Sequence, residues 1–213
     1  MIDIGFPPLN MIDKKKLFNK YDIEKMLKVN KEEKVILFTY HPVPNEIDKI
    51  KLIFRSLKSL QSKYIKIIIT YPNFDPGYKY VIKEIKKLKN ENIVVVQNLG
   101  RKMYFSILNY LGTYNKGICM GNSSSGIKET LFFNCKTINL GTRQKSRLKT
   151  KNIFDCELKV ENITKKTKKI LKLKTNFRNI LNPYYSKKKF NNLDKKILKL
   201  LKLKDLNRKK ITY

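Results

Sequence analysis

Residues 116–144, KGICMGNSSSGIKETLFFNCKTINLGTRQ, contain the pattern that decides the fold. The stretch begins with a short apolar run, 116–120, passes through a glycine- and serine-rich turn into a helical pattern over 125–133, and ends with a second apolar run, 136–140. Short apolar runs bounded by turn residues are typical of buried strands. Two parallel strands joined by a crossover helix are therefore expected here.

The same alternation of strand and helix patterns covers most of the chain. Further strands are predicted over 34–40, 64–71, 92–96 and 152–155, and further helices over 46–60, 78–89 and 102–111. Continuous apolar strands separated by amphipathic helices require a parallel sheet that is covered on both faces. We therefore predict an α/β fold, a Rossmann-like doubly wound parallel sheet.

The two ends of the chain differ from this central part. We interpret residues 1–12 as the remnant of an interdomain linker, 13–182 as the Rossmann-like domain and 183–213 as a basic C-terminal helix and tail. One side of that helix carries the apolar residues Phe190, Leu193, Ile197, Leu198 and Leu201. Such a helix is typical of a membrane-surface segment or of a helix docked on its own domain. We favour the docked helix.

Charge is the strongest compositional signal, with 48 basic and 17 acidic residues and a net charge of +31. Such an excess favours nucleic acid or an anionic surface as a partner. However, six of the basic residues are Arg and the rest are Lys, and the chain contains no Ala. This pattern is typical of AT-rich codon usage, so we expect neither a nucleic-acid nor a membrane partner.

Targeting and metal-binding signals are absent from the sequence. No apolar run approaches the ~18 residues that span a bilayer, and the N-terminus lacks a signal-peptide pattern, so we expect a cytoplasmic protein. Cys119, Cys135 and Cys156 have no metal-ligand spacing, and their odd number favours reduced, packed thiols. We expect no structural metal.

The turn after the 116–120 strand is the best candidate for a binding site. Ligands of open parallel sheets bind at the carboxyl ends of the strands. Small residues let the backbone approach a ligand, and successive amides and hydroxyls suit a phosphate or diphosphate. The turn matches neither the Walker loop nor GxGxxG, so no nicotinamide cofactor is indicated. The candidate residues are Asn122, Ser123, Ser124, Ser125 and Gly126.

Three other residues are expected at the same edge of the sheet. Glu129, one turn into the following helix, is suited to accept hydrogen bonds from ribose hydroxyls. Arg143 follows the 136–140 strand, and its planar guanidinium suits a phosphate. His41 is the single histidine and follows the 34–40 strand; its role is open between proton transfer and phosphate binding.

Six motifs taken in order resemble a known family. They are FTYHPV (38–43), YPNFDPG (71–77), NLGR (98–101), GNSSSGIKE (121–129), INLGTRQ (138–144) and NPYY (182–185). Together they resemble the C-terminal half of the hydrolysing UDP-N-acetylglucosamine 2-epimerases of sialic-acid and related nonulosonic-acid synthesis.

The resemblance implies the C-terminal, nucleotide-binding half of a GT-B architecture. It also implies that Ser123, Ser124 and Glu129 hold the diphosphate and ribose of UDP, that Arg143 assists at the diphosphate, and that His41 lies beside the reacting centre. The implied reaction removes UDP by elimination and then hydrates the glycal, giving N-acetylmannosamine and UDP without a cofactor. The resemblance further suggests a homo-oligomer.

The chain departs from the family pattern at its N-terminus. Family members carry a complete N-terminal Rossmann-like half before the matched segment. We therefore expect a fragment, a subunit that works with a separate N-terminal half, or a decayed copy, which binds UDP with little or no turnover alone. Two alternatives are the donor-nucleotide domain of a GT-B glycosyltransferase and a basic protein that binds nucleic acid or an anionic surface.

Overall fold

A computed structural model describes residues 5–88, 90–174, 176–185 and 193–202. Contacts divide the chain into two units, one formed by Asp13–Leu181 and the other by Met1–Ile12 with Asn182–Tyr213.

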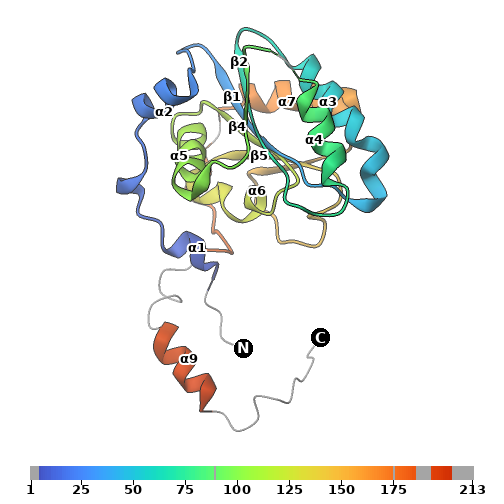
Figure 1. The fold of residues 1–213 in the computed structure, drawn as a ribbon. Coiled ribbons are helices and arrows are strands. Elements are labelled where there is room, and N and C mark those ends of the chain that lie inside the picture. Colours follow the sequence, from blue (N-terminus) through green and yellow to red (C-terminus); the bar gives the residue numbers. More distant parts are fainter. Residues whose placement is uncertain (1–4, 89, 175, 186–192, 203–213) are drawn as a thin grey trace. The chain divides into compact units, whose positions relative to one another are not determined.

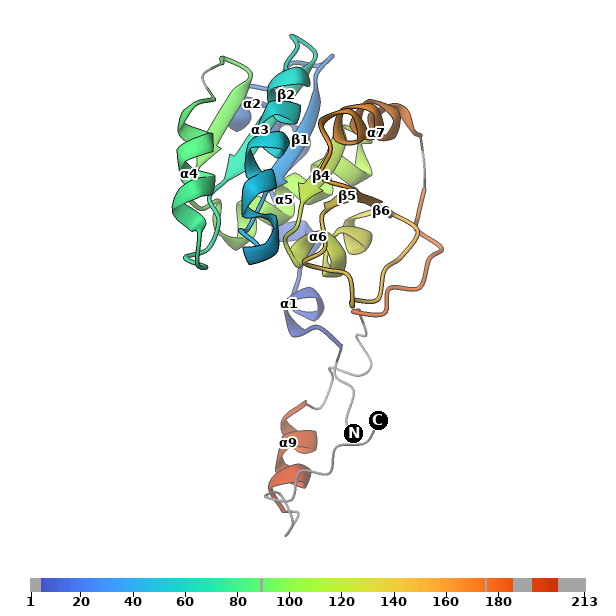
Figure 2. The same cartoon turned by 90° about the vertical axis from the view of Figure 1, so that its right-hand side faces the viewer.

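The larger unit is built on a six-stranded parallel sheet with the order β3-β2-β1-β4-β5-β6 (Figures 1 and 2). Its strands are β1 (Lys34–Thr39), β2 (Ile65–Thr70), β3 (Ile93–Val96), β4 (Gly117–Gly121), β5 (Lys136–Leu140) and β6 (Ile153–Cys156). The predicted α/β, Rossmann-like doubly wound sheet is confirmed. β1 pairs with both β2 and β4, so the strand order reverses between β1 and β4.

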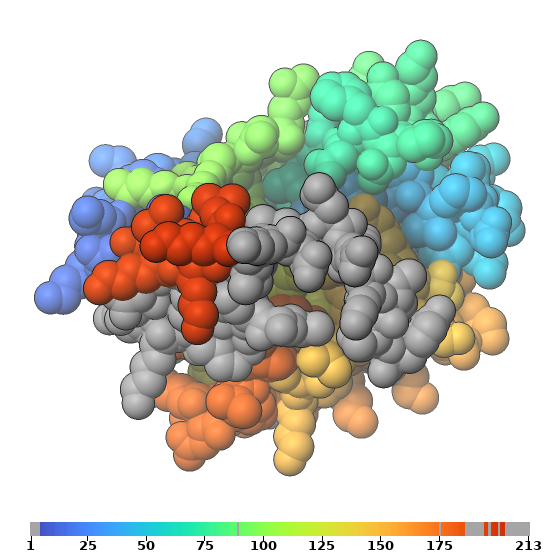
Figure 3. Space-filling model, turned by 90° about the horizontal axis from the view of Figure 1, so that it is seen from below, coloured from blue at the N-terminus to red at the C-terminus, as the bar shows by residue number. Residues whose placement is uncertain are grey.

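Helices cover both faces of this sheet. On one face lie α3 (Ile50–Ser59), α4 (Tyr78–Lys86) and α7 (Val160–Lys172), and on the other α2 (Lys20–Leu27) and α5 (Gly100–Thr113) (Figure 1). α3 and α4 pack side by side and lie together at one side of the surface in Figure 3. The short helices are α6 (Ser125–Lys128) and the 3-10 segments Lys14–Lys16, Pro44–Lys49 and Thr130–Phe133.

The interior explains why the strand sequences are apolar. The central residues of β1 and all of β4 and β5 are buried, and β2 is buried after its first residue. Ile36, Phe38 and Ile118 form one core with Ile53 and Leu57 of α3. Burial of such side chains contributes about 1.5–3 kcal/mol each, which fixes the central strands as the rigid base of the loops that follow them.

Two predicted helices differ in detail from the structure. The segment predicted over 46–60 starts as the 3-10 turn Pro44–Lys49 before α3 begins. The segment predicted over 125–133 is interrupted at Glu129, between α6 and a 3-10 turn. There the Thr130 hydroxyl donates to the Gly126 carbonyl at 2.8 Å. Such back-bonding competes with the regular helical hydrogen bond and tightens the turn.

The smaller unit contains α1 (Pro7–Asn10) and α9 (Leu193–Leu201). The Phe6 amide donates to the Tyr184 carbonyl at 2.7 Å, which joins the two ends of this unit. In α9, Ile197, Leu198 and Leu201 are exposed, and Phe190 lies outside the described residues, so the docked helix stays a prediction.

Among the helices of the described residues, none is both long and apolar enough to cross a membrane.

Candidate functional site

The loops that follow β1, β4 and β5 meet where the strand order reverses. Thr39, the last residue of β1, is in register with Gly121, the last residue of β4. Gly121 has φ +138°, and a Cβ atom there would lie 1.8 Å from the Thr39 carbonyl oxygen. Only glycine allows this close approach, which brings the two loops together at the crevice where ligands of such sheets bind.

Asn122 joins the loop after β4 to the loop after β1. The His41 backbone amide donates to Asn122 Oδ1 at 2.7 Å, and Asn122 Nδ2 donates to the His41 carbonyl oxygen at 2.7 Å. Asn122 is fully buried. Its side chain is therefore occupied by protein partners.

The Asn122 carbonyl oxygen binds two side chains of the loop after β5. It accepts hydrogen bonds from Gln144 Nε2 at 2.9 Å and from Arg143 Nη1 at 3.3 Å. Arg143 Nη2 also lies 3.5 Å from Asp75 Oδ2, in the loop after β2. The guanidinium is partly exposed and so can meet an incoming anion while these contacts hold its plane.

His41 is buried beside these charged groups. Its Nδ1 accepts a hydrogen bond from the Asn73 amide at 3.2 Å and lies 3.9 Å from Asp75 Oδ2. Burial, helped by the nearby Arg143 charge and opposed by Asp75, lowers the pKa of His41 to about 4. The ring is therefore neutral at pH 7, and because Nδ1 is an acceptor, its proton is on Nε2.

The serine turn presents one unused hydroxyl. Ser123 Oγ accepts from the Ser125 amide at 3.4 Å, and Ser125 Oγ lies 2.8 Å from the Tyr104 hydroxyl and donates to Glu129. Within the part of the chain that the structure describes, the half-buried Ser124 hydroxyl has no hydrogen-bond partner. The Ser124 hydroxyl is thus available to a ligand.

Glu129 faces the same turn but is held by it. Burial raises the pKa of this carboxyl, an effect that is partly offset by the hydrogen bond from Ser125 and by the charges of Arg101 and Lys128. Gly126 is buried, and a Cβ atom there would lie 3.1 Å from Thr137 Cγ2, so this glycine lets the turn pack closely on β5.

Glu46 is a buried carboxylate that the sequence analysis did not identify. Its Oε1 accepts from the Thr142 amide at 3.0 Å and from the Thr142 hydroxyl at 2.8 Å, and its Oε2 accepts from the Tyr40 hydroxyl at 3.2 Å. Burial and the Glu46 charge raise the pKa of Tyr40. Glu46 thus clamps the loop that carries Arg143, and sequence spacing gives no signal for this contact.

We call this assembly the reversal site; it consists of His41, Asn122, Ser123, Ser124, Ser125, Gly126, Glu129 and Arg143. The structure brings the residues predicted from the sequence to one edge of the sheet, around the ends of β1, β4 and β5. Within the described residues, no group of three His, Cys, Asp or Glu side chains could hold a metal ion. Cys119, Cys135 and Cys156 are buried and unpaired.

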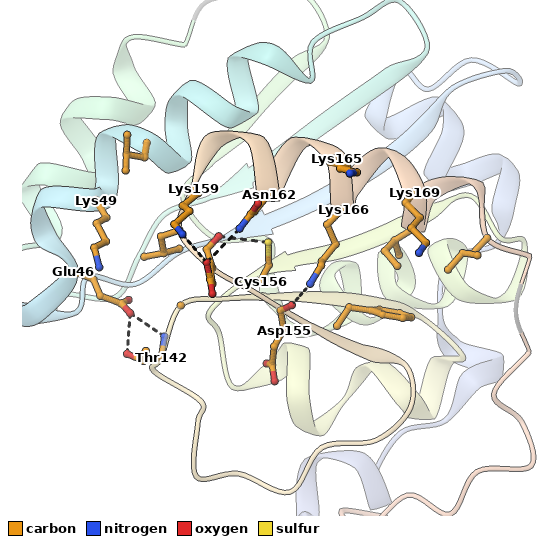
Figure 4. A pocket seen from close by; sticks show the side chains of 17 residues that line it. Glu46, Lys49, Thr142, Asp155, Cys156, Lys159, Asn162, Lys165, Lys166 and Lys169 are labelled. Carbon is orange, nitrogen blue, oxygen red and sulfur yellow. Dashed lines mark hydrogen bonds and ion pairs between the residues drawn. The ribbon is translucent and has the colours of Figure 1, made fainter.

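A hollow lies beside the edge strand β6, between β6 and α7, and it extends to Gly141 and Thr142 in the loop after β5 (Figure 4). We call it the β6–α7 groove; its volume is about 1260 Å³. Its apolar wall includes Leu52, Phe154 and Leu158, and its rim carries Lys49, Lys159, Lys165, Lys166 and Lys169. Lys166 donates to the Asp155 carbonyl oxygen, so it covers part of the edge of β6.

The family model described as UDP-N-acetylglucosamine 2-epimerase matches residues 2–201. The chain belongs to this family. A relative from Campylobacter jejuni, named GDP/UDP-N,N'-diacetylbacillosamine 2-epimerase (hydrolyzing), is 32% identical over 165 residues, which cover 74% of this chain and 41% of that protein. The matched part of this epimerase family member therefore covers less than half the length of that relative.

Solved structures show the same fold. S. aureus MnaA with UDP aligns with a TM-score of 0.65 and 15% identity, covering 100% of this chain and 56% of that one. The Methanocaldococcus jannaschii UDP-GlcNAc 2-epimerase in complex with UDP-GlcNAc and UDP aligns with a TM-score of 0.60 and 16% identity, covering 93% and 53%. Identities this low establish a shared fold, and the residue roles must come from the site itself.

Proposed function

We propose that this chain is the UDP-binding domain of a hydrolysing UDP-sugar 2-epimerase. The observation that carries the proposal is the reversal site, where an unpartnered Ser124 hydroxyl and the partly exposed Arg143 guanidinium lie at one edge of the sheet. A hydroxyl and a fixed guanidinium are suited to the oxygens of a diphosphate.

Glu129 extends the proposed site from the diphosphate to the ribose. Its carboxylate is held by the Ser125 hydroxyl in a position where burial already opposes its charge. Ribose hydroxyls that replaced or joined this contact would stabilise the charged form, because charge-assisted hydrogen bonds are the stronger kind. We expect Glu129 to be ionised in the complex.

His41 is proposed to act at the sugar end of the nucleotide. A neutral imidazole with its proton on Nε2 can donate that proton, or a hydrogen bond, to an oxygen that gains charge when UDP leaves C1. The elimination also needs a base at the C2 proton, and hydration of the glycal needs a proton donor.

The sugar is proposed to be a UDP-linked 2-acetamido sugar. The names of the relatives divide between N,N'-diacetylbacillosamine, as in the Campylobacter jejuni and Legionella pneumophila proteins, and N-acetylglucosamine, as in the Neisseria meningitidis protein. All three names include UDP, the group that the reversal site would hold, and the Campylobacter jejuni name includes GDP as well. We expect the 213-residue chain to bind UDP, and we assign turnover to an assembly that includes a second, N-terminal half.

Calorimetric titration with UDP tests the proposal. We expect saturable one-site binding, and about tenfold weaker binding by Ser124→Ala, because a hydrogen bond to a charged group contributes about 1.5 kcal/mol or more. Lys169→Ala in the β6–α7 groove is the matched control and is expected to bind like the native chain. Equal affinity of the native and Ser124→Ala chains would contradict the proposed site.

Salt dependence separates this function from binding driven by the net charge of +31. A polyanion-binding protein would lose affinity steeply as salt rises and would bind nucleic acid without competition from UDP. The proposed domain would prefer UDP to inorganic diphosphate. Competition by UDP is therefore measured at two salt concentrations.

A further inference from the structure

We propose that Asn122 is a positioning residue, which fixes His41 and Arg143 through its side-chain amide and its own carbonyl. The role belongs to the site of the proposed function and so rests on it, but the hydrogen bonds of Asn122 do not require any particular nucleotide. The sequence alone had placed Asn122 among the residues that touch UDP.

The first step of the argument is the pairing that Asn122 adds at the end of the sheet. The β1–β4 ladder ends at the pair Thr39 and Gly121, and the Asn122 amide donates to the Thr39 carbonyl oxygen at 3.2 Å. Beyond this point the two 2.7 Å hydrogen bonds of the Asn122 side chain satisfy both the amide and the carbonyl of His41. The side chain thus replaces the strand residue that would continue the ladder.

The second step is that few other side chains could do this. A carboxamide offers one donor and one acceptor on the same short group, as a peptide unit does. Aspartate of the same shape would offer no donor and would face the His41 carbonyl oxygen with a second acceptor. Asn122 and His41 are both buried, so an unpaired amide or carbonyl would cost about 1–3 kcal/mol.

The third step is that the same residue also holds Arg143. The Asn122 carbonyl oxygen accepts from Arg143 Nη1 and Gln144 Nε2, while Arg143 Nη2 reaches Asp75. Asp75 in turn lies beside His41 Nδ1. Displacement of Asn122 would therefore change the position of both groups that are proposed to act on the diphosphate and the sugar.

NMR of the imidazole tests this role directly, because His41 is the single histidine of the chain. In the native chain we expect the Nε2-protonated tautomer and a pKa near 4. The charged groups that face the ring are Asp75 and Arg143. In Asn122→Ala, the freed loop would admit water, and we expect the pKa of His41 to rise by at least about one unit toward its ordinary value near 6.5.

Asn152→Ala is the matched control for a purely structural effect. Asn152 is also fully buried, and its Nδ2 donates to Thr130 Oγ1 at 3.0 Å and to the Cys135 carbonyl oxygen at 2.8 Å, away from His41. We expect Asn152→Ala to lower the free energy of unfolding while the His41 tautomer and pKa stay native. If Asn122→Ala does not fold, Asn122→Ser, which can make at most part of the pairing, is measured in its place.

Two outcomes decide the proposal. A shifted His41 titration in the Asn122 variant, with a native one in the Asn152 variant and about tenfold weaker UDP binding in the former alone, supports the positioning role. A folded Asn122 variant with a native His41 tautomer and pKa overturns it. The titration is made without nucleotide, so failure of the native chain to bind UDP would contradict the proposed function and leave this test of Asn122 intact.

Discussion

The reversal site and the β6–α7 groove both carry cations, and they differ in how those cations are held. In the reversal site, Arg143 is fixed by Asn122 and Asp75 beside a buried His41. In the groove, Lys165 and Lys169 have no ion-pair or hydrogen-bond partner among the described residues. Only six of the 48 basic residues of this chain are Arg. An arginine with two fixed contacts therefore indicates a specific anion site, whereas one more surface lysine does not. Charge alone therefore does not distinguish a site with fixed contacts from a lysine-lined groove.

The largest expected effect concerns the close approach of Gly121 to the Thr39 carbonyl oxygen, which brings the loops of the reversal site together. We expect Gly121→Ala to lower the free energy of unfolding by about 4 kcal/mol or more, because the added Cβ would overlap the Thr39 carbonyl oxygen. Gly100→Ala is the control: Gly100 also has positive φ, but a Cβ there meets nothing within 4 Å, so we expect a loss of about 1–2 kcal/mol. Urea unfolding measures both, and equal losses would contradict the close approach.

The next effect concerns pH. The pKa of His41 is lowered to about 4 in the folded chain, below its ordinary value of 6.5, so the unfolded chain binds more protons between these values. Stability should therefore fall as pH drops from about 6.5 to 4, by up to about 3 kcal/mol from this group. The measurement is the difference in pH dependence between the native chain and His41→Asn. Parallel stability curves for the two chains would count against a buried neutral imidazole.

The third effect compares arginine with lysine at the reversal site. We expect Arg143→Lys to weaken UDP binding by about thirtyfold, or ~2 kcal/mol, because a lysine keeps the charge but loses the fork that holds two partners. Lys166→Arg in the groove keeps its charge in the same way and should leave UDP affinity unchanged. Native affinity in Arg143→Lys would show that net charge, and not a fixed guanidinium, attracts the nucleotide.

A smaller effect is expected at Glu129. Because burial raises the pKa of this carboxyl, its charge destabilises the folded chain at neutral pH, and the penalty disappears as pH falls below the folded pKa. Glu129→Gln should therefore be slightly more stable than the native chain at pH 7 but bind UDP about five- to tenfold more weakly. Calorimetry and thermal unfolding measure the two effects, and a variant that is less stable at pH 7 would contradict this account.

The smallest expected effect belongs to the groove. The double variant Lys165→Ala with Lys169→Ala should change the free energy of unfolding by less than about 0.5 kcal/mol and leave UDP affinity unchanged, because both lysines are exposed. A loss of UDP affinity of tenfold or more would indicate that the β6–α7 groove, and not the reversal site, binds the nucleotide.

Most of the sheet could be predicted from the sequence because buried parallel strands are continuous apolar runs. All six predicted strands are present, and every strand end differs by one residue or less from the prediction. The helix α7 was not predicted. Its buried face includes Thr167, whose hydroxyl lies 3.5 Å from Met120 Sδ, so a polar residue interrupts the apolar pattern there.

The site was predictable in its location and less so in its contacts. His41, the serine turn and Arg143 each follow a predicted strand. Because parallel strands point the same way, the sequence predicted that all three lie at one edge of the sheet. The sequence did not predict the hydrogen bonds of Asn122 to His41 or of Glu46 to Thr142, because these partners lie 81 and 96 residues apart. Contacts at that separation leave no local periodicity to detect.

The central place of β1 in the sheet also has a consequence for synthesis of the protein. β1 is synthesised about 80 residues before its neighbour β4 and the Asn122 side chain that binds His41, and Arg143 comes later still. Closing so long a segment is entropically costly and slow compared with forming a local hairpin or helix. Under the proposed function, a nascent chain that ends before residue 143 would therefore lack Arg143 and could not yet form the complete nucleotide site.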